Sequence, residues 1–232
     1  MADRRPIPDE LRGRAFGIAE GNAAGLSTKA LARQSLVRPY RGVRATEPAH
    51  DSREQVLRFG PRLRDGQALS ARSALLVYGL PLPRRHRSAI VDVLVRQSAS
   101  RPRAEGVLAR RIRDGLWAAD RIEGVQVVTL PLLFALLAGS SSETELITVG
   151  DAMISSFDRY PGRMSPGPLV RLSSLFDMGE RWGRLRGGAV LHRALPRLRE
   201  HVASPPESWL RCIIVDAGIE EPAVNADIYE GG

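Results

Sequence analysis

The stretch AIVDVLVRQ (89–97) is the first of four short segments that decide the fold class of this chain. The others are GVLARRIR (106–113), LWAADRI (116–122) and VQVVT (125–129), and turns that contain glycine, or arginine and proline, separate the four. Short segments with β-branched and aromatic residues that are bounded by turn residues are typical of strands. Their close spacing predicts a small antiparallel sheet.

The chain after this sheet is predicted to be helical, because four apolar runs there have the length and spacing of helices. These runs are LPLLFALLAG (130–139), ETELITVGDAMISSF (143–157), GPLVRLSSLFDMG (167–179) and GAVLHRALPRLREHV (188–202). Before the sheet, a helical pattern within 50–64 places Val56, Leu57 and Leu63 on one side. ALSARSALLVYG (68–79) predicts a helix capped by Ser70 and ended by Gly79. Residues 49–200 are therefore expected to form a mixed α+β central domain.

Composition places the chain among ordinary globular proteins. Its 232 residues are 43% hydrophobic and 26% charged. It lacks an uninterrupted apolar run of about 18 residues, so neither a membrane span nor a membrane partner is expected. The segment MADRRPIPDELRGR (1–14) has no apolar core of the kind that a secretory signal contains. We therefore expect a cytoplasmic protein.

Motifs for catalysis or metal binding are scarce. Cys212 is the sole cysteine, which excludes an internal disulfide and a cysteine-rich zinc site. The phosphate-binding glycine loop, HExxH and GxSxG motifs are absent, and the four histidines lack metal-ligand spacing. Asp151, which follows Gly150, is predicted to be a cap or turn residue. No metal site and no cofactor is expected from these patterns.

Positive charge is concentrated at the amino end. The chain has a formal net charge of +8, and Lys29 is its sole lysine. Nine basic and four acidic residues within 1–45 give that segment a net charge of +5. Short helices are expected within 8–14 and 16–25, and LSTKALARQSL (26–36) predicts a further helix capped by Ser27 or Thr28. VRPYRGVRA (37–45) has the alternation and turn residues of a tight hairpin or wing.

A helix, a turn, a capped helix and a basic hairpin suggest a winged helix-turn-helix in residues 1–48, in which the second helix enters the major groove of DNA. The predicted DNA-binding residues are Ser27, Thr28, Lys29 and Arg33 on or near that helix, and Arg38, Arg41 and Arg44 on the wing. Arginine and lysine supply phosphate contacts, and one arginine could read guanine. The alternative is a small helical cap with a solvated basic face, and the residues alone do not choose between the two.

The segment SPPESWLRCIIVDAG (204–218) predicts a capped helix that Gly218 ends. Ser204 and Glu207 have the spacing of a capping box, in which each side chain binds the backbone amide of the other. Pro205 suits the first helical position. Trp209, Leu210, Ile213, Ile214 and Ala217 would form its apolar face. AVNADIY (223–229) is expected to be a strand.

Three segments together resemble a group of actinobacterial proteins in which they occur in the same order. They are residues 16–45, 68–83 and 204–229. The amino end of those proteins is similar to AbiEi-type antitoxins of type IV toxin–antitoxin systems and to transcriptional regulators. The resemblance implies a DNA-binding transcriptional regulator whose partners are double-stranded DNA and a cognate toxin protein. A homodimer on DNA is a further expectation.

Many of those proteins continue into a domain similar to very-short-patch-repair endonucleases of the PD-(D/E)XK superfamily, which implies an alternative function as a metal-dependent DNA endonuclease. Glu207 matches the glutamate that opens the first helix of that domain, near its catalytic site. The later acidic motifs do not occur before Gly232, and Mg²⁺- or Mn²⁺-dependent hydrolysis needs several carboxylates. Residues 201–232 are thus expected to be a truncated start of the nuclease-like domain, without activity. A third possibility is an interaction module whose basic surface binds an acidic protein.

Overall fold

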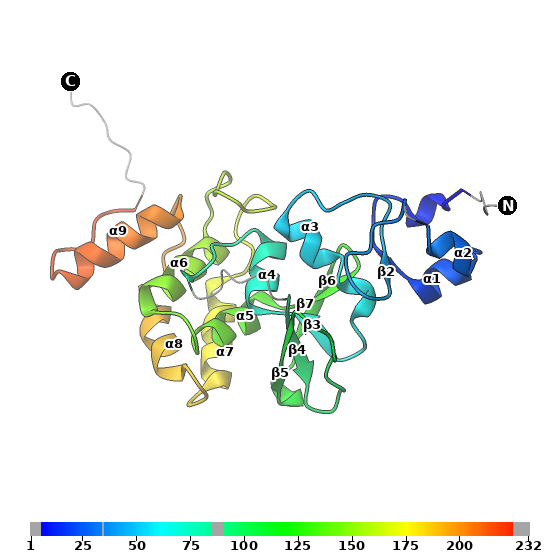
Figure 1. Cartoon of the computed structure of the whole chain (residues 1–232). Helices are drawn as coiled ribbons and strands as arrows, with labels where there is room; N and C mark the ends of the chain where they lie inside the picture. The colour runs from blue at the N-terminus through cyan, green and yellow to red at the C-terminus, as the bar shows by residue number, and fades with distance from the viewer. Residues whose placement is uncertain (1–5, 34, 85–90, 225–232) are drawn as a thin grey trace, which may run out of the picture. The chain divides into compact units, whose positions relative to one another are not determined.

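The structure of the chain is a computed structural model that describes residues 6–33, 35–84 and 91–224. It is a mixed α+β structure with a two-stranded and a five-stranded sheet among the described residues, so the predicted α+β class is confirmed (Figure 1). The chain divides into two compact units. The predicted domain boundaries at 48 and 200 do not coincide with this division, and they stay predictions.

The first unit consists of Met1–Val77, Ile90–Asp114 and Ala119–Val127. The second unit consists of Tyr78–Ala89, Gly115–Ala118 and Val128–Gly232.

The amino end of the first unit packs around a small core of its own. Its elements are η1 (Asp9–Leu11), β1 (Phe16–Gly17), α1 (Ile18–Ala23), α2 (Thr28–Leu31) and β2 (Val43–Arg44). The buried side chains that they share are Leu11, Phe16, Leu26, Ala30, Leu31 and Leu36. Because η1, β1 and α2 each contribute a side chain to this core, the segment holds a defined arrangement despite having little regular structure.

The predicted hairpin at 37–45 is present, whereas the predicted helix at 26–36 is shorter than expected. Val37 and Ala45 form an antiparallel bridge, and β2 pairs with β1 in antiparallel register. Helix α2, however, is a single turn that ends at Leu31. The carbonyl groups of Leu31 and of the capping residue Ala32 accept hydrogen bonds from arginine side chains of the hairpin, so they do not need a further helical turn.

The next part of the first unit leads into the larger sheet through α3 (Ser52–Leu57), η2 (Gly60–Arg62), β3 (Gln67–Leu69) and α4 (Ala71–Tyr78). Val56 and Leu57 are buried in α3, as the helical pattern predicted, but Leu63, predicted on the same side, is half-buried and extended after η2. Helix α4 begins directly after Ser70 and ends before Gly79, which has a φ of +70°. A glycine in this conformation ends a helix without steric cost, so the predicted end of α4 is confirmed.

The four predicted strands are confirmed, but their predicted antiparallel arrangement is wrong. They are β4 (Val91–Arg96), β5 (Val107–Ile112), β6 (Ala119–Ile122) and β7 (Val125–Val128), and the sheet order is β5-β4-β3-β7-β6 (Figure 1). Strand β3 pairs antiparallel with β4 and parallel with β7, and β4 pairs parallel with β5. The sheet is mixed because β4 and β5, which follow one another in the sequence, pair in parallel, and because β3, a strand that the sequence pattern missed, pairs in parallel with β7.

Asp92 on β4 is a buried carboxyl group whose protonation should affect stability. Asp92 is only 8% exposed, and burial raises the pKa of its carboxyl group from 3.8 to about 6. The positive charges of Arg110 and Arg72 act in the opposite direction. Because the folded-state pKa lies above the ordinary value, the contribution of Asp92 to stability is fully present below about pH 4. That contribution is lost as the pH rises through about 6.

We therefore expect Asp92→Asn to remove a pH-dependent loss of stability between about pH 4 and 6. At pH 7 the variant should exceed the wild type in free energy of unfolding by up to about 3 kcal/mol, since that is the free energy of the raised pKa. Urea denaturation at several pH values measures the difference, with the exposed Asp120→Asn as control. A difference between Asp92→Asn and wild type that does not change with pH would contradict the expectation.

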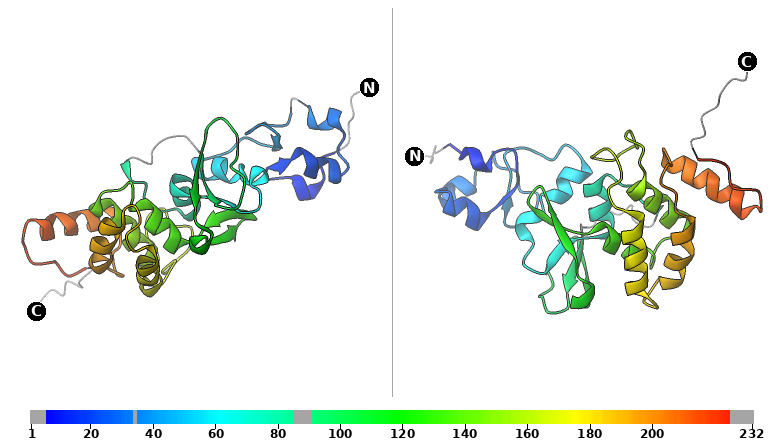
Figure 2. Two further views of the ribbon diagram at one scale, coloured as in Figure 1. Left: turned by 90° about the horizontal axis from the view of Figure 1, so that it is seen from below. Right: turned by 180° about the vertical axis from the view of Figure 1, so that it is seen from behind.

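The second unit is helical, and all five helices predicted there are confirmed. They are α5 (Leu130–Leu137), α6 (Glu143–Ile154), α7 (Leu172–Trp182), α8 (Gly188–Ala194) with η5 (Leu195–Arg197), and α9 (Pro205–Asp216). Figure 2 shows α5 to α8, coloured green to orange, gathered into one body. Ser142 and Glu145 form a capping box at the start of α6, with Glu145 N bound to Ser142 Oγ at 3.2 Å and Ser142 N bound to Glu145 Oε2 at 2.9 Å.

The short helix η4 (Asp114–Leu116) connects β5 to β6. Within the described ranges, no helix has the length and apolar character needed to cross a bilayer. The strand predicted at 223–229 falls, from residue 225 on, outside the described residues.

Candidate functional site

The residues predicted to bind DNA around α2 have two different roles in the structure. Ser27 is the cap of α2, because its Oγ accepts a hydrogen bond from Ala30 N at 3.2 Å. Thr28 and Lys29 are exposed on the single turn of the helix, while Ala30 and Leu31 face the core. Helix α2 therefore presents one hydroxyl and one ammonium group to the outside.

Two of the three predicted wing arginines bind the helix. The Nε atom of Arg44 donates to Leu31 O at 2.6 Å, and Nη2 of Arg38 donates to Ala32 O at 3.0 Å. These are carbonyl groups at the end of α2, which basic side chains commonly satisfy. Burial, and after it the charge of Arg38, lowers the pKa of Arg44. Arg38 and Arg44 therefore fix the hairpin against the end of α2.

The two remaining predicted residues lie outside these contacts. Arg33 is half-buried just after α2. Arg41 is exposed at the turn of the hairpin, next to Gly42, whose φ of +84° requires glycine. The backbone of Arg41 is also held, because its carbonyl oxygen accepts from Arg62 Nη1 at 2.9 Å. We call residues 27–33 and 35–44 the 27–44 segment, and in it Lys29 and Arg41 are exposed.

Glu207 lies at the start of α9, but the predicted reciprocal capping box with Ser204 is wrong. Ser204 makes no side-chain capping bond, and Glu207 Oε2 accepts instead from Ala203 N at 2.7 Å. The carboxylate thus satisfies the amide one residue earlier than expected. Among the described residues, no group of three or more His, Cys, Asp and Glu side chains is placed to hold a metal ion. The endonuclease alternative remains a prediction from the resemblance.

The most buried charge cluster in the second unit is one that sequence reasoning missed. Asp151, predicted as a cap or turn residue, lies inside α6 with 0% exposure. Its Oδ2 accepts from Arg211 Nη2 at 2.8 Å and from Ser208 Oγ at 2.7 Å, and its Oδ1 accepts from Arg199 N at 2.8 Å. Asp151 therefore connects α6 to α9 and to the segment that precedes α9.

Glu221 extends this cluster on the other side of Arg211. Its two carboxylate oxygens accept from Arg211 Nη1 at 2.8 Å and from Arg199 Nη2 at 2.6 Å. Burial acts to lower the pKa of Arg211, but Asp151 and Glu221 outweigh burial and raise it. Arg211, which is 3% exposed, is therefore held as a charged guanidinium between two carboxylates. An aspartate within an otherwise apolar helical run was the sequence signal for this cluster.

The orientation of α9 follows from this cluster and is opposite to the predicted one. Ser208, Arg211 and Cys212 are buried, whereas Leu210 and Ile213 are 59% and 58% exposed. The predicted apolar face of α9 is thus largely open to solvent. The helix buries polar side chains because the carboxylate of Asp151 requires donors inside the second unit.

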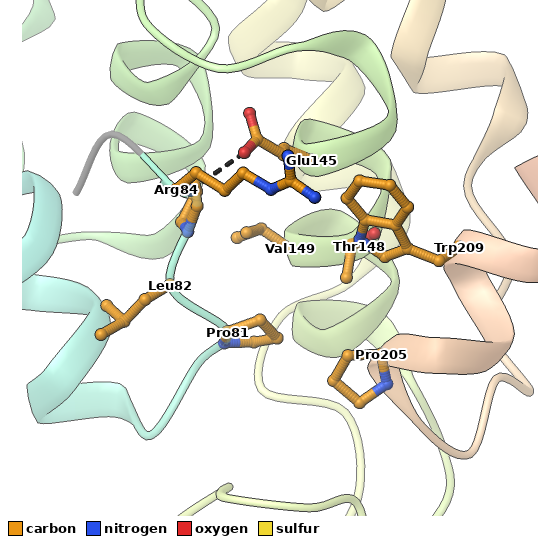
Figure 3. Close-up of a pocket in the computed structure, with 9 residues that line it drawn as sticks. Pro81, Leu82, Arg84, Glu145, Thr148, Val149, Pro205 and Trp209 are labelled. Carbon is orange, nitrogen blue, oxygen red and sulfur yellow. Dashed lines mark hydrogen bonds between the residues drawn. The ribbon is translucent and has the colours of Figure 1, made fainter. Parts of the chain in front are cut away.

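A small pocket in the second unit lies between α6, α9 and the segment after α4 (Figure 3). Its volume is about 310 Å³. The guanidinium of Arg84 lies over the ring of Trp209, with 5.8 Å between Arg84 Cζ and the ring centroid. Glu145 at its upper edge accepts from Arg84 N at 2.9 Å and also caps α6. Its charged groups are therefore engaged in holding the pocket walls together.

A serine–histidine pair in the second unit has the residue types of a hydrolase but not the arrangement. Ser156 Oγ and His201 Nδ1 are 2.9 Å apart, and both residues are exposed. The same hydroxyl donates to Glu200 O at 3.2 Å. In a serine nucleophile the imidazole accepts the hydroxyl proton. Here the hydroxyl also lies 3.2 Å from the carbonyl oxygen of Glu200, and the pair connects two loop segments.

Comparisons with known proteins give little information about this chain. No family model matches the sequence, and no curated protein matches it. A search of solved structures finds a similarity to the RV2827C protein from Mycobacterium tuberculosis, with 16% sequence identity and a TM-score of 0.42. The alignment covers 82% of this chain and 78% of that chain. A likeness at this TM-score carries no argument about function.

Proposed function

We propose that this chain is a DNA-binding transcriptional regulator of the kind that AbiEi-type antitoxins represent, and that its 27–44 segment contacts duplex DNA. The observation that carries the proposal is the attachment of the hairpin to α2 through Arg38 and Arg44. This attachment fixes the exposed Lys29 and Arg41 relative to one another. A helix turn and a basic hairpin held as one piece suit contact with two neighbouring parts of a duplex.

The proposal assigns different roles to the residues of the segment. Lys29 and Arg41 contact phosphate groups, and Thr28 lies beside Lys29 on the exposed turn. Ser27 and Arg44 act as positioning residues, because their side chains bind the backbone of α2. Arg33, which is half-buried, is assigned a further phosphate contact, and Arg38, which binds Ala32 O, adds positive charge to the same surface. The cognate toxin and the homodimer stay predictions of the resemblance.

The proposal predicts binding that weakens steeply with salt. Each lysine or arginine that neutralises a phosphate releases a counterion, so the slope of log K against log salt is about −0.9 for each contact. Fluorescence anisotropy with a labelled 30-base-pair duplex from the DNA upstream of the gene measures this slope. A duplex of scrambled sequence separates specific from general binding.

The double variant Lys29→Ala/Arg33→Ala should reduce the slope by about 2 and weaken binding about tenfold or more at 0.1 M salt. Arg171→Ala/Arg184→Ala, two exposed positions of the second unit, removes the same charge and is the matched control. If the two double variants bind equally well, the 27–44 segment is not the DNA-binding surface. If the wild type does not bind either duplex, the proposed function is wrong.

A further inference from the structure

A pocket in the first unit collects six arginine side chains. It has a volume of about 900 Å³, and the arginines that line it are Arg41, Arg62, Arg64, Arg101, Arg103 and Arg111. Its lining includes neither an acidic nor an aromatic side chain. We refer to it as the arginine pocket. Of these six arginines, only Arg41 also belongs to the 27–44 segment.

The arginine pocket is assembled from four separate parts of the first unit. Buried Gln67 on β3 joins two of them, because its Nε2 donates to Ser100 O at 2.7 Å and its Oε1 accepts from Arg64 N at 3.1 Å. Arg62 Nη1 holds the turn of the hairpin through Arg41 O. Arg111 on β5 donates to Ala99 O at 3.3 Å. The walls are therefore fixed by hydrogen bonds to the backbone.

The charges of the arginine pocket are not balanced by carboxylates. Within residues 6–33, 35–84 and 91–224, none of the six arginines forms an ion pair with an acidic side chain. Elsewhere in the first unit, Arg53 pairs with Glu123 and Arg58 pairs with Glu54. Positive charges that face one hollow repel one another, and a bound anion converts this repulsion into attraction.

The composition of the pocket indicates which anion it binds. Guanidinium groups match phosphate oxygens with two parallel hydrogen bonds. Proteins that bind single-stranded nucleic acid stack its bases on aromatic side chains, and the lining contains none. The exposed positions Arg64, Arg101 and Arg103 instead offer separated charges along an open surface, as the backbone of a duplex requires.

We infer that the arginine pocket binds phosphate groups of a DNA duplex as a second contact surface, adjoining the 27–44 segment at Arg41. The inference rests on the proposed function, since it assigns a further surface to the same ligand. Contacts to phosphates carry no sequence information. The arginine pocket therefore adds affinity for any duplex, while the 27–44 segment carries whatever sequence preference exists.

The test is the triple variant Arg64→Ala/Arg101→Ala/Arg103→Ala, measured by anisotropy with the upstream and the scrambled duplex. We expect the salt slope to fall by about 2 to 3, because about 0.9 is lost for each phosphate contact. Affinity for both duplexes should fall by the same factor, about tenfold or more at 0.1 M salt. Arg159→Ala/Arg171→Ala/Arg184→Ala removes an equal charge from exposed positions of the second unit and should leave the slope unchanged.

A second variant separates charge from geometry. Arg64→Lys/Arg101→Lys/Arg103→Lys keeps three positive charges but loses the planar fork, so the salt slope should stay within about 1 of the wild type while affinity falls. Circular dichroism confirms that each variant is folded. A wild-type slope in the folded triple alanine variant would overturn the inference, even if Lys29→Ala/Arg33→Ala loses binding and so supports the proposed function.

Competition with inorganic tripolyphosphate distinguishes the phosphate groups of DNA from a free polyphosphate as the ligand of the arginine pocket. Competition by tripolyphosphate against the duplex should be weaker for the triple alanine variant than for the wild type, which would support phosphate binding in the arginine pocket. Tripolyphosphate binding by a wild-type protein that binds neither duplex would overturn the assignment to DNA. It would also show that the proposed function, and not the phosphate chemistry of the pocket, had failed.

Discussion

Arg211→Ala is expected to lower the free energy of unfolding of the second unit by about 3–5 kcal/mol. The variant leaves the carboxylate of Asp151, which is 0% exposed, without its charged partner. It also removes one of the two arginine contacts of Glu221. Most of the cost comes from the uncompensated charge of Asp151 and not from the loss of a favourable contact, because a buried charge without a partner is strongly unfavourable.

Urea denaturation followed by tryptophan fluorescence measures the effect, because Trp117, Trp182 and Trp209 all belong to the second unit. Arg193→Ala is the matched control, because the ion pair of Arg193 with Glu143 is exposed and should contribute about 1 kcal/mol or less. The double variant Asp151→Asn/Arg211→Met removes both charges and should be more stable than Arg211→Ala. Equal effects of Arg211→Ala and Arg193→Ala would show that the buried cluster does not hold α9.

The positions of several helices could be predicted because their ends are marked in the sequence. Ser142 and Glu145 have the spacing of a capping box and form one. Gly79 and Gly218 follow the last residues of α4 and α9 and have φ values of +70° and +77°. These signals act within a few residues, so an isolated sequence contains them in full.

The buried face of α9 could not be predicted in the same way. Its apolar residues suggested one face, yet Ser208, Arg211 and Cys212 are buried in the structure. The partner that determines this choice is Asp151 on α6, far away in the sequence. A hydrophobic pattern describes which residues share a face, but it does not show which face meets a buried carboxylate.

The sheet topology and the contacts of the candidate site also depend on residues that are far apart in the sequence. Strand β3 has three residues, too few for a recognisable pattern, and the strand pattern of β4 and β5 does not show that the two pair in parallel. Arg38 and Arg44 were predicted to lie on the wing, and sequence alone did not show that they bind backbone carbonyls at the end of α2. The arginine pocket joins residues from 41 to 111, and it is formed only when β3, β4 and β5 pair.

Gly187→Ala is expected to lower the free energy of unfolding of the second unit by roughly 2 to 5 kcal/mol, through two separate costs. Gly187 precedes α8 and has a φ of +83°, which costs a residue with a Cβ about 1–2 kcal/mol. The new Cβ would also lie 2.4 Å from Ala138 C and Gly139 N. These are backbone atoms after α5, so the overlap can be relieved only by moving the chain, at a cost of about 1–3 kcal/mol.

Gly218→Ala separates the two costs. Gly218 has a φ of +77° at the end of α9, and a Cβ there would meet nothing within 4 Å. Its substitution should therefore show only the cost of the left-handed backbone, about 1–2 kcal/mol. Urea denaturation of the two variants measures the difference, which reports how rigidly the start of α8 packs on the end of α5. Equal values would mean that the backbone of Ala138 and Gly139 yields without cost.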